Sequence, residues 1–205
     1  QNPGGEGPAW ERPASLELIH PDGTRGFHIN CGVRLRGGFS RSTDNPKHAF
    51  RFFFREDYGA AKLQYRLFPD DPTAAEEFDK IDLRTFQNYS WSFGGDPGGT
   101  FMRDQLSRDM QLAMNHTGER GNYCHLYVNG VYWGIYNTDE RPEAGYAASY
   151  FGGVREDYDV IKIDPRVSID RNQESDRISC LGGNDRGNTF TIDGIPQSDV
   201  YGLND

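Results

Sequence analysis

The chain has 205 residues, and its 31 acidic and 22 basic side chains give a formal net charge of −9, which excludes the basic surface typical of nucleic-acid-binding proteins. Only 35% of the residues are hydrophobic but 13% are aromatic, so we expect a core of few, large side chains. The 25 glycines and 11 prolines follow no short period, and no apolar run is long enough for a transmembrane helix, which excludes collagen, coiled coils, mostly helical bundles and membrane-spanning helices.

Period-two alternation of apolar residues predicts strands in the first half of the chain. Residues 1–13, rich in Pro and Gly, form a lead-in linker without periodicity. The clearest strand signal runs from Phe27 to Leu35, where every second residue is apolar. The other expected elements are a strand with Leu16 and Leu18, a turn at 21–23, a Gly/Ser-rich loop over 37–46, and a strand with Phe50, Phe52 and Phe54 on one face.

The second half predicts one substantial helix and one hairpin. Thr100 is expected to cap a helix over 101–115, with Asp104 and Arg108 paired on its polar side. Asn129-Gly130 predicts a tight hairpin between strands 123–128 and 131–136. The remaining expected elements are a short helix over 73–78, a strand over 80–85, a Gly-rich loop over 87–99, a short helix over 141–151, a strand over 158–163, and an apolar stripe on the main helix made of Met102, Leu106, Met110, Ala113 and Met114.

These elements predict an α+β fold, a mainly antiparallel, curved sheet with one main helix packed against it. The chain is polar and turn-rich after Asp164, so we place a domain boundary near residue 165, with an irregular tail over 165–205. Cys31, Cys124 and Cys180 show no CxxC spacing, which excludes a thiolate zinc site. Cys31 and Cys124 fall on predicted strands, and we expect buried thiols rather than a disulfide. The absence of an initial Met and of a signal peptide indicates a piece of a longer protein.

Two clusters of side chains could carry chemistry. The run RLRGGFSRSTDNPKHAFRF (residues 34–52) combines a Gly pair, serines and cations, which suits phosphate binding; a flexible hairpin loop with solvated charges is the alternative. Carboxylates gather late in the first domain, where they could hold a divalent cation or form a solvated acidic face. They are Asp139, Glu140, Glu143, Glu156, Asp157 and Asp159.

Several long motifs together resemble the CotH family of spore-coat, kinase-like proteins. They are GVRLRGGFSRSTDNPKHAFRFFF, the segment from LFPDD to FDKIDLRTFQNYSW, FMRDQLSRDMQLAMNH, and HLYVNGVYWGIYNTDERPEA followed by EDYDVIKID, in this order between about residues 2 and 164. The resemblance implies the N-terminal lobe of an atypical, secreted or cell-surface bacterial protein kinase. Such a kinase would use ATP and Mg²⁺ to phosphorylate serines of extracellular or coat proteins.

The resemblance also implies roles for seven residues. The loop with Gly37, Gly38 and Ser40 would lie over the nucleotide phosphates, and Lys47, opening the following strand, would contact them. The helix with Arg103 and Asp104 would buttress this lobe, and Glu140 would lie near the nucleotide cleft. The family's catalytic and metal-binding aspartates follow the segment matched by DYDVIK, and neither pattern occurs after Lys162. We therefore expect no kinase turnover from this chain alone, and its metal ligands stay unknown.

The last 25 residues, 181–205, weakly resemble the "IDGIP" segment of TonB-dependent receptor plug domains. Two partial motifs that meet near residue 165 indicate either a fusion or an artificial join of two genes. The alternative to a kinase-like domain is a non-catalytic cell-surface module whose aromatic-rich β face binds glycan or protein. A plug fragment is the third reading.

Overall fold

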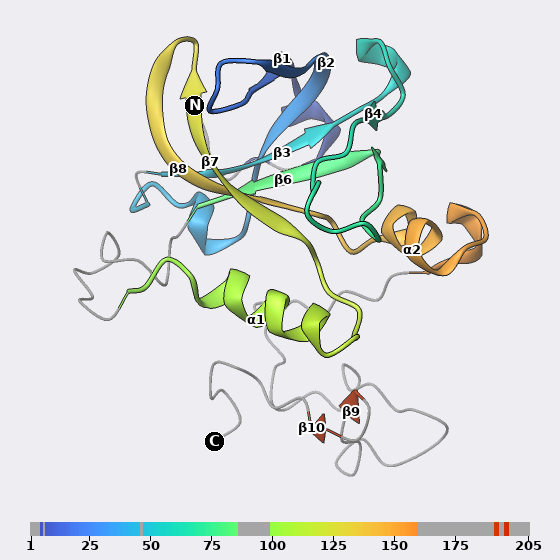
Figure 1. Cartoon of the computed structure of the whole chain (residues 1–205). Helices are drawn as coiled ribbons and strands as arrows, with labels where there is room; N and C mark the ends of the chain where they lie inside the picture. Colours follow the sequence, from blue (N-terminus) through green and yellow to red (C-terminus); the bar gives the residue numbers. More distant parts are fainter. Residues whose placement is uncertain are drawn as a thin grey trace, which may run out of the picture. The chain divides into compact units, whose positions relative to one another are not determined.

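Six strands form one curled antiparallel sheet in the order β1-β2-β3-β6-β8-β7 (Figure 1). The strands are β1 (Arg12–Ile19), β2 (Arg25–Arg36), β3 (Ala49–Phe53), β6 (Lys80–Arg84), β7 (Gly121–Val128) and β8 (Val131–Asp139). Two helices, α1 (Arg103–Ala113) and α2 (Ala144–Phe151), accompany them. The α+β class with a mainly antiparallel, curved sheet is therefore confirmed.

The computed structural model describes residues 5, 7–45, 47–85 and 99–159, together with the backbone of 191–192 and 195–196. The chain divides into two compact units, Gln1–Val160 and Ile161–Asp205. In the second unit, β9 (Thr191–Ile192) and β10 (Ile195–Pro196) form a two-stranded antiparallel sheet. The described residues of the first unit also form four short 3-10 helices, η1 (Pro8–Trp10), η2 (Phe39–Arg41), η3 (Glu56–Tyr58) and η4 (Arg155–Asp157). Among the described residues, no helix has the length and hydropathy of a membrane span.

One face of the sheet is apolar and covers the core. Alternation along each strand places its large apolar residues on this face. The short strands β4 (Leu63–Gln64) and β5 (Glu77–Phe78), with the chain around them, pack against it. The buried core residues are Cys31, Phe52, Phe54, Leu63, Leu67, Phe68, Phe78, Ile81, Leu83 and Tyr136. Cys31 is buried, Cys124 is half-buried and both are free thiols, as expected.

The other face of the sheet is charged, because the alternate positions of the same strands carry ionic side chains. On β2 these are Arg34 and Arg36; on β3, Arg51; on β6, Lys80, Asp82 and Arg84; and on β8, Asp139, which shares the face with the neutral amide of Asn137. Glu11, just before β1, is buried and binds Arg34 of β2, with Arg34 Nε donating to its Oε2 at 2.7 Å. The sheet therefore separates an aromatic core from a layer of ion pairs.

The β7–β8 hairpin turns at Asn129-Gly130, as the sequence predicts. Both residues have positive φ, 51° and 79°, as a two-residue type I′ turn requires. The register shifts between Leu126 and Tyr127 by one extra residue on β8, a β-bulge. Because β8 pairs with β6 only over Asn137–Asp139, the hairpin extends beyond the end of β6.

The two longer helices that the sequence predicts, over 101–115 and 141–151, are present as α1 and α2, but α1 differs from the prediction in its cap and its ion pairs. The residue before α1 is Met102, with no side-chain cap, so Thr100 is not the N-cap. The predicted pair is also wrong, because Asp104 binds Arg84 and Arg108 binds Asp139. The short helix expected over 73–78 is absent from these described residues.

The reason for that absence is a competing local bond and a buried ring. Asp71 Oδ1 accepts from the backbone N–H and the hydroxyl of Thr73, which favours a turn. Phe78 pairs with Leu63 and packs edge-on against Phe68, so the chain is extended there. The strand expected over 158–163 falls mostly outside the described residues, and Tyr158 and Asp159 are not in a strand.

Candidate functional site

The Gly37–Ser40 loop begins directly after β2 and takes its shape from a glycine. Gly37 has φ 107°, and a Cβ at this position would overlap Ser40 Oγ. The backbone N–H of Arg41 donates to the Gly38 carbonyl at 3.0 Å and closes η2. His48 Nδ1 donates to the Ser40 carbonyl at 3.0 Å. This bond joins the backbone of the loop to the residue that follows Lys47.

Lys47 precedes β3 and lies across β8. Its Nζ donates to the Ile135 carbonyl at 2.8 Å and sits 4.5 Å from the centre of the Tyr136 ring. Burial lowers the pKa of this ammonium, and Cys124 opposes the shift. Within the described part of the chain, no carboxylate lies at ion-pair distance from Lys47. The amine is thus half-buried, and its positive charge has no anionic partner there.

Gly134 of β8 makes room for this lysine. It has φ 119°, and a Cβ built on it would lie 2.5 Å from Lys47 Nζ. A side chain at this position would therefore both strain the backbone and displace the amine. The glycine interrupts the apolar run VYWGIY, and a glycine inside a strand pattern is a sequence signal of a close approach.

The charged face of the sheet contains a buried carboxylate between two arginines. Asp82 is 1% exposed. Arg51 donates two hydrogen bonds to its carboxylate, from Nε to Oδ1 at 2.6 Å and from Nη2 to Oδ2 at 2.9 Å. Arg36 Nε lies 2.9 Å from the same Oδ2. Burial lowers the pKa of Arg36, although Asp82 opposes this shift. Since Arg36 directly precedes Gly37, this cluster fixes the strand end from which the loop leaves.

A second ionic cluster attaches α1 to the sheet. Arg108 Nη1 lies 2.6 Å from Asp139 Oδ1, and Arg84 Nη1 lies 2.6 Å from Asp104 Oδ2. Arg84 Nε also lies 3.7 Å from Asp139 Oδ2. Burial raises the pKa of Asp139 to about 6 against the effect of the two arginines. Arg103, the other residue expected on this helix, is exposed on its first turn.

Glu140 is buried at the end of β8 and bound within the protein. Its Oε2 accepts from the backbone N–H of Arg120 at 2.8 Å, and the Tyr150 hydroxyl donates to its Oε1. Burial raises the pKa of this carboxyl, and these bonds lower it. Strand residues rise about 3.3 Å each, so Glu140 lies about 16 Å along β8 from Ile135, the residue that binds Lys47. The structure does not bring Glu140 and Lys47 side by side.

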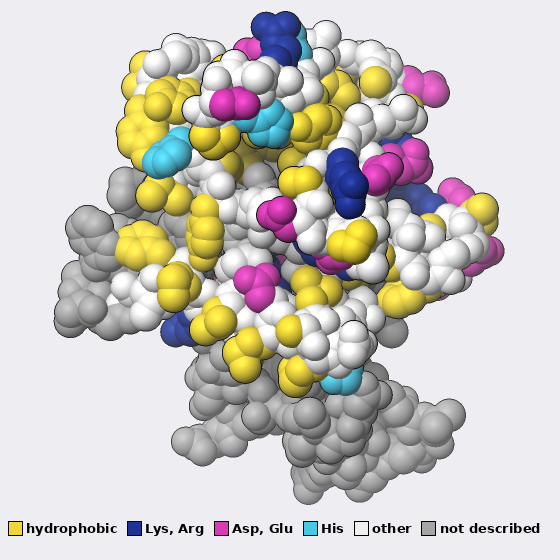
Figure 2. Space-filling model, viewed as in Figure 1, with side chains coloured by type: hydrophobic (Ala, Val, Ile, Leu, Met, Phe, Trp, Pro, Cys, Tyr) yellow, Lys and Arg dark blue, Asp and Glu magenta, His cyan; other side chains and the backbone are white. Residues whose placement is uncertain are grey.

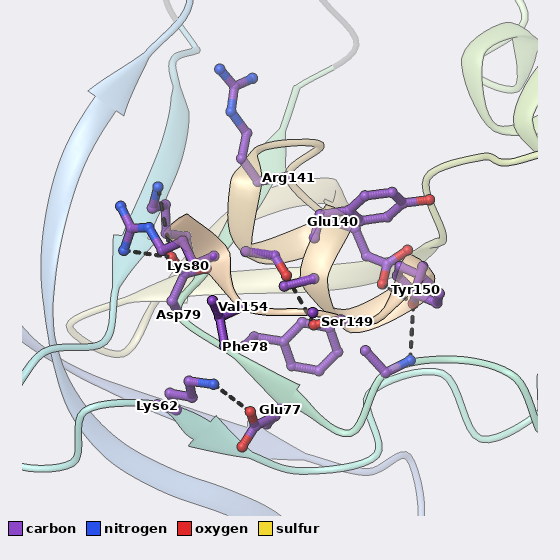
Figure 3. Close-up of a pocket in the computed structure, with 16 residues that line it drawn as sticks. Lys62, Glu77, Phe78, Asp79, Lys80, Glu140, Arg141, Ser149, Tyr150 and Val154 are labelled. Atoms are coloured by element: carbon purple, nitrogen blue, oxygen red, sulfur yellow. Dashed lines mark hydrogen bonds and ion pairs between the residues drawn. The ribbon is translucent and has the colours of Figure 1, made fainter. Parts of the chain in front are cut away.

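Glu140 instead lines a pocket of about 340 Å³ between α2 and the β5–β6 segment (Figure 3). Phe78, Tyr150 and Val154 supply apolar wall, and Figure 3 shows Asp79 and Lys80 at the opposite side from Tyr150. The charges that line the pocket are paired: Lys62 with Glu77, Lys80 with Glu143 and Asp79, Arg155 with Asp79, and Arg141 with Glu143. The pocket therefore presents no surplus of either sign.

The late carboxylates divide into two groups. Glu156, Asp157 and Asp159 are exposed, as the expected solvated acidic face requires, whereas the other three are paired. Asp139, Glu140 and Glu143 each bind arginine or lysine rather than converge on one point. In the described ranges there is no group of three His, Cys, Asp or Glu that could hold a metal ion. Sequence reasoning missed the arginine partners because Arg84, Arg108 and Arg120 are brought to these carboxylates only by strand order and helix docking.

Comparison with known proteins gives one finding. A family model described as CotH kinase protein matches residues 33–185, well over half of the chain. The match includes the end of β2, the Gly37–Ser40 loop, Lys47 and both helices. No curated protein matches the sequence.

Proposed function

The chain belongs to the CotH kinase protein family, and on this premise we propose that it binds ATP, with the phosphates at the Gly37–Ser40 loop and Lys47. The family membership agrees with the resemblance that the sequence motifs indicate. Serine phosphorylation of extracellular or coat proteins, and secretion to the cell surface, are the wider part of this proposal and rest on the family alone.

The observation that carries the nucleotide proposal is the environment of Lys47. A half-buried ammonium usually has a carboxylate partner, because burial of a lone charge costs free energy. Lys47 has only the Ile135 carbonyl and the face of Tyr136 among the described residues. An anion at this amine would supply the missing charge, and backbone N–H groups of the adjoining glycine loop can bind further phosphate oxygens.

Magnesium does not fit the residues that the structure describes. Mg²⁺ binds carboxylate oxygens at near-octahedral geometry, and the buried carboxylates Asp82, Asp139 and Glu140 are all held by arginines. We therefore derive no catalytic step through a protein-bound metal. We expect no transfer of the γ-phosphate by this chain to a serine-containing peptide, measured against Lys47→Ala as the background.

Thermal melting with and without ATP and Mg²⁺ tests the binding proposal. A ligand at 100 times its Kd stabilises the folded state by about 2.7 kcal/mol, or about 5–11 °C for a chain of this size. Lys47→Ala is expected to lose this shift. Lys62→Ala is the matched control, since Lys62 is exposed and pairs with Glu77, and it is expected to keep the shift.

No shift in the wild-type chain, or an equal shift in Lys47→Ala, would contradict a nucleotide site at this loop. That outcome favours the second candidate, a non-catalytic module that binds through an aromatic β surface. The observation in its favour is the β7–β8 hairpin, on which Tyr127 and Tyr132 are 61% and 50% exposed.

A further inference from the structure

The helix α1 docks on the sheet with its polar side and turns its apolar side outward. Gln105 is buried and its Oε1 accepts from Asn137 Nδ2 at 2.9 Å, while Arg108 binds Asp139. The apolar stripe that should form a helix's buried face is more than half exposed. Its large members are Met102 (55%), Leu106 (52%), Met110 (56%) and Met114 (55%), and Ala113 is exposed as well. An amphipathic helix with its apolar face in solvent indicates a contact outside this unit.

The β7–β8 hairpin has the same character. Residues 121–138 contain no Asp, Glu, Lys or Arg, although 26% of the chain is charged. The large side chains exposed on it are Tyr123, Tyr127, Val128, Val131, Tyr132, Trp133 and Ile135. Solvent-facing hairpins normally carry charges that prevent association, and this one does not.

The helix and the hairpin adjoin. The Tyr123 hydroxyl of β7 donates to the Phe101 carbonyl, just before α1, at 3.0 Å. Figure 2 shows hydrophobic side chains along α1 and again on the hairpin above it, with few charged groups between. We call this surface the hairpin–helix face. It is formed along α1 by Met102, Leu106, Met110 and Met114. On the hairpin it is formed by Tyr123, Tyr127, Tyr132 and Ile135, which the strand register places on one face.

The two edges of the sheet differ in their protection. The edge strand β1 contains Pro13 and the charged residue Glu17, which pairs with Arg25 of β2. Proline and charged side chains on an edge strand both oppose pairing with another strand. The opposite edge strand, β7, has neither proline nor an ionised side chain. Within the described part of the chain, its outer edge pairs with no strand.

We propose that two copies of this chain associate through the hairpin–helix face, with the β7 strands paired antiparallel across a twofold axis. An antiparallel edge pair is self-complementary, so the same strand serves both copies. The lack of charge on the hairpin lets two chains of net charge −9 meet there without like charges in contact. Half-exposed side chains of about 200 Å² each give on the order of 800 Å² for this face, equal to the roughly 800 Å² per partner of a standard interface.

Sedimentation velocity of the full chain over a range of concentrations tests this proposal. The wild-type chain is expected to form a dimer in the micromolar range or below. Tyr127→Lys places a charge on the unprotected edge and is expected to weaken the dimer at least about tenfold. The matched control is Ile19→Lys on β1, since Ile19 and Tyr127 are both 61% exposed, and it is expected to leave the dimer unchanged.

Met110→Lys tests the helix part of the face separately, and far-UV circular dichroism checks that each variant is folded. A wild-type chain that stays monomeric would overturn the proposal. This holds also if the hairpin–helix face then proves to bind a glycan or another protein. A dimer that tolerates both Tyr127→Lys and Met110→Lys would overturn it as well, because association would then occur elsewhere. The nucleotide proposal at Lys47 is unaffected by either result.

Discussion

Replacement of Asp82 by Asn should destabilise the first unit strongly, because it leaves two arginines beside one another without their shared carboxylate. Asp82 is 1% exposed and binds both Arg51 and Arg36. Removal of one partner from a buried ion pair costs about 3–5 kcal/mol. The arginine side chains keep 18% and 22% exposure, so solvent screens part of their repulsion, and we expect the lower value, about 3 kcal/mol.

The assay is urea and thermal unfolding of the full chain, followed by circular dichroism. For a chain of this size, about 3 kcal/mol corresponds to a fall in Tm of about 6–12 °C. Glu77→Gln removes the same charge from the Lys62–Glu77 pair, whose side chains are 49% and 48% exposed, and should cost no more than about 1 kcal/mol. Equal, small losses for Asp82→Asn and Glu77→Gln would refute the reasoning, since the Asp82 cluster would then behave as a solvated surface pair.

Three further changes test other parts of the structure. The pKa of Asp139 is raised from 3.8 to about 6. The stability that the protonated carboxyl contributes is therefore present below about pH 4 and is lost as the pH rises through 6. Between pH 4 and 7 the unfolding free energy of the wild-type chain should fall by about 3 kcal/mol relative to that of Asp139→Asn, measured by unfolding at a series of pH values. Gly134→Ala should cost about 1–2 kcal/mol from its positive φ and reduce the ATP-dependent rise in Tm, because the added Cβ meets Lys47 Nζ. Tyr150→Phe leaves the buried Glu140 Oε1 and the Ala75 N–H without their hydroxyl partner, so it should lower the free energy of unfolding in urea by about 1–3 kcal/mol. The control, Tyr158→Phe, loses only an exposed bond to the Gly152 carbonyl and should cost less than about 1 kcal/mol.

The strands could be predicted from sequence because their signal is local. Alternation from Phe27 to Leu35 and the Asn129-Gly130 turn specify β2 and the β7–β8 hairpin without knowledge of any neighbour. The loop near Lys47 was also accessible, since glycines and a lysine lie within eleven residues of one another. These features need no tertiary information.

The orientation of α1 could not be predicted in the same way. The apolar stripe of α1 predicts that this side of the helix is buried. It gives no information about the surface beneath the helix, which is charged. That surface is assembled from β6 and β8, where Arg84, Asn137 and Asp139 face the helix. The pairing of Asp82 with Arg51 likewise depends on β3 lying beside β6, a neighbour relation that joins residues 31 positions apart.

Tyr136 links the hydrophobic core to the neighbourhood of Lys47. It is fully buried, and the centroid of its ring lies 5.9 Å from that of Phe50. Its hydroxyl donates to the His48 carbonyl at 2.9 Å, and the face of its ring lies under the Lys47 ammonium. A change in core volume at Phe50 would tilt this ring and so move both Lys47 and the loop that His48 holds. Substitutions in the core and at the anion site would therefore be epistatic, and a lineage could not adjust affinity at this lysine independently of how its aromatic core is packed.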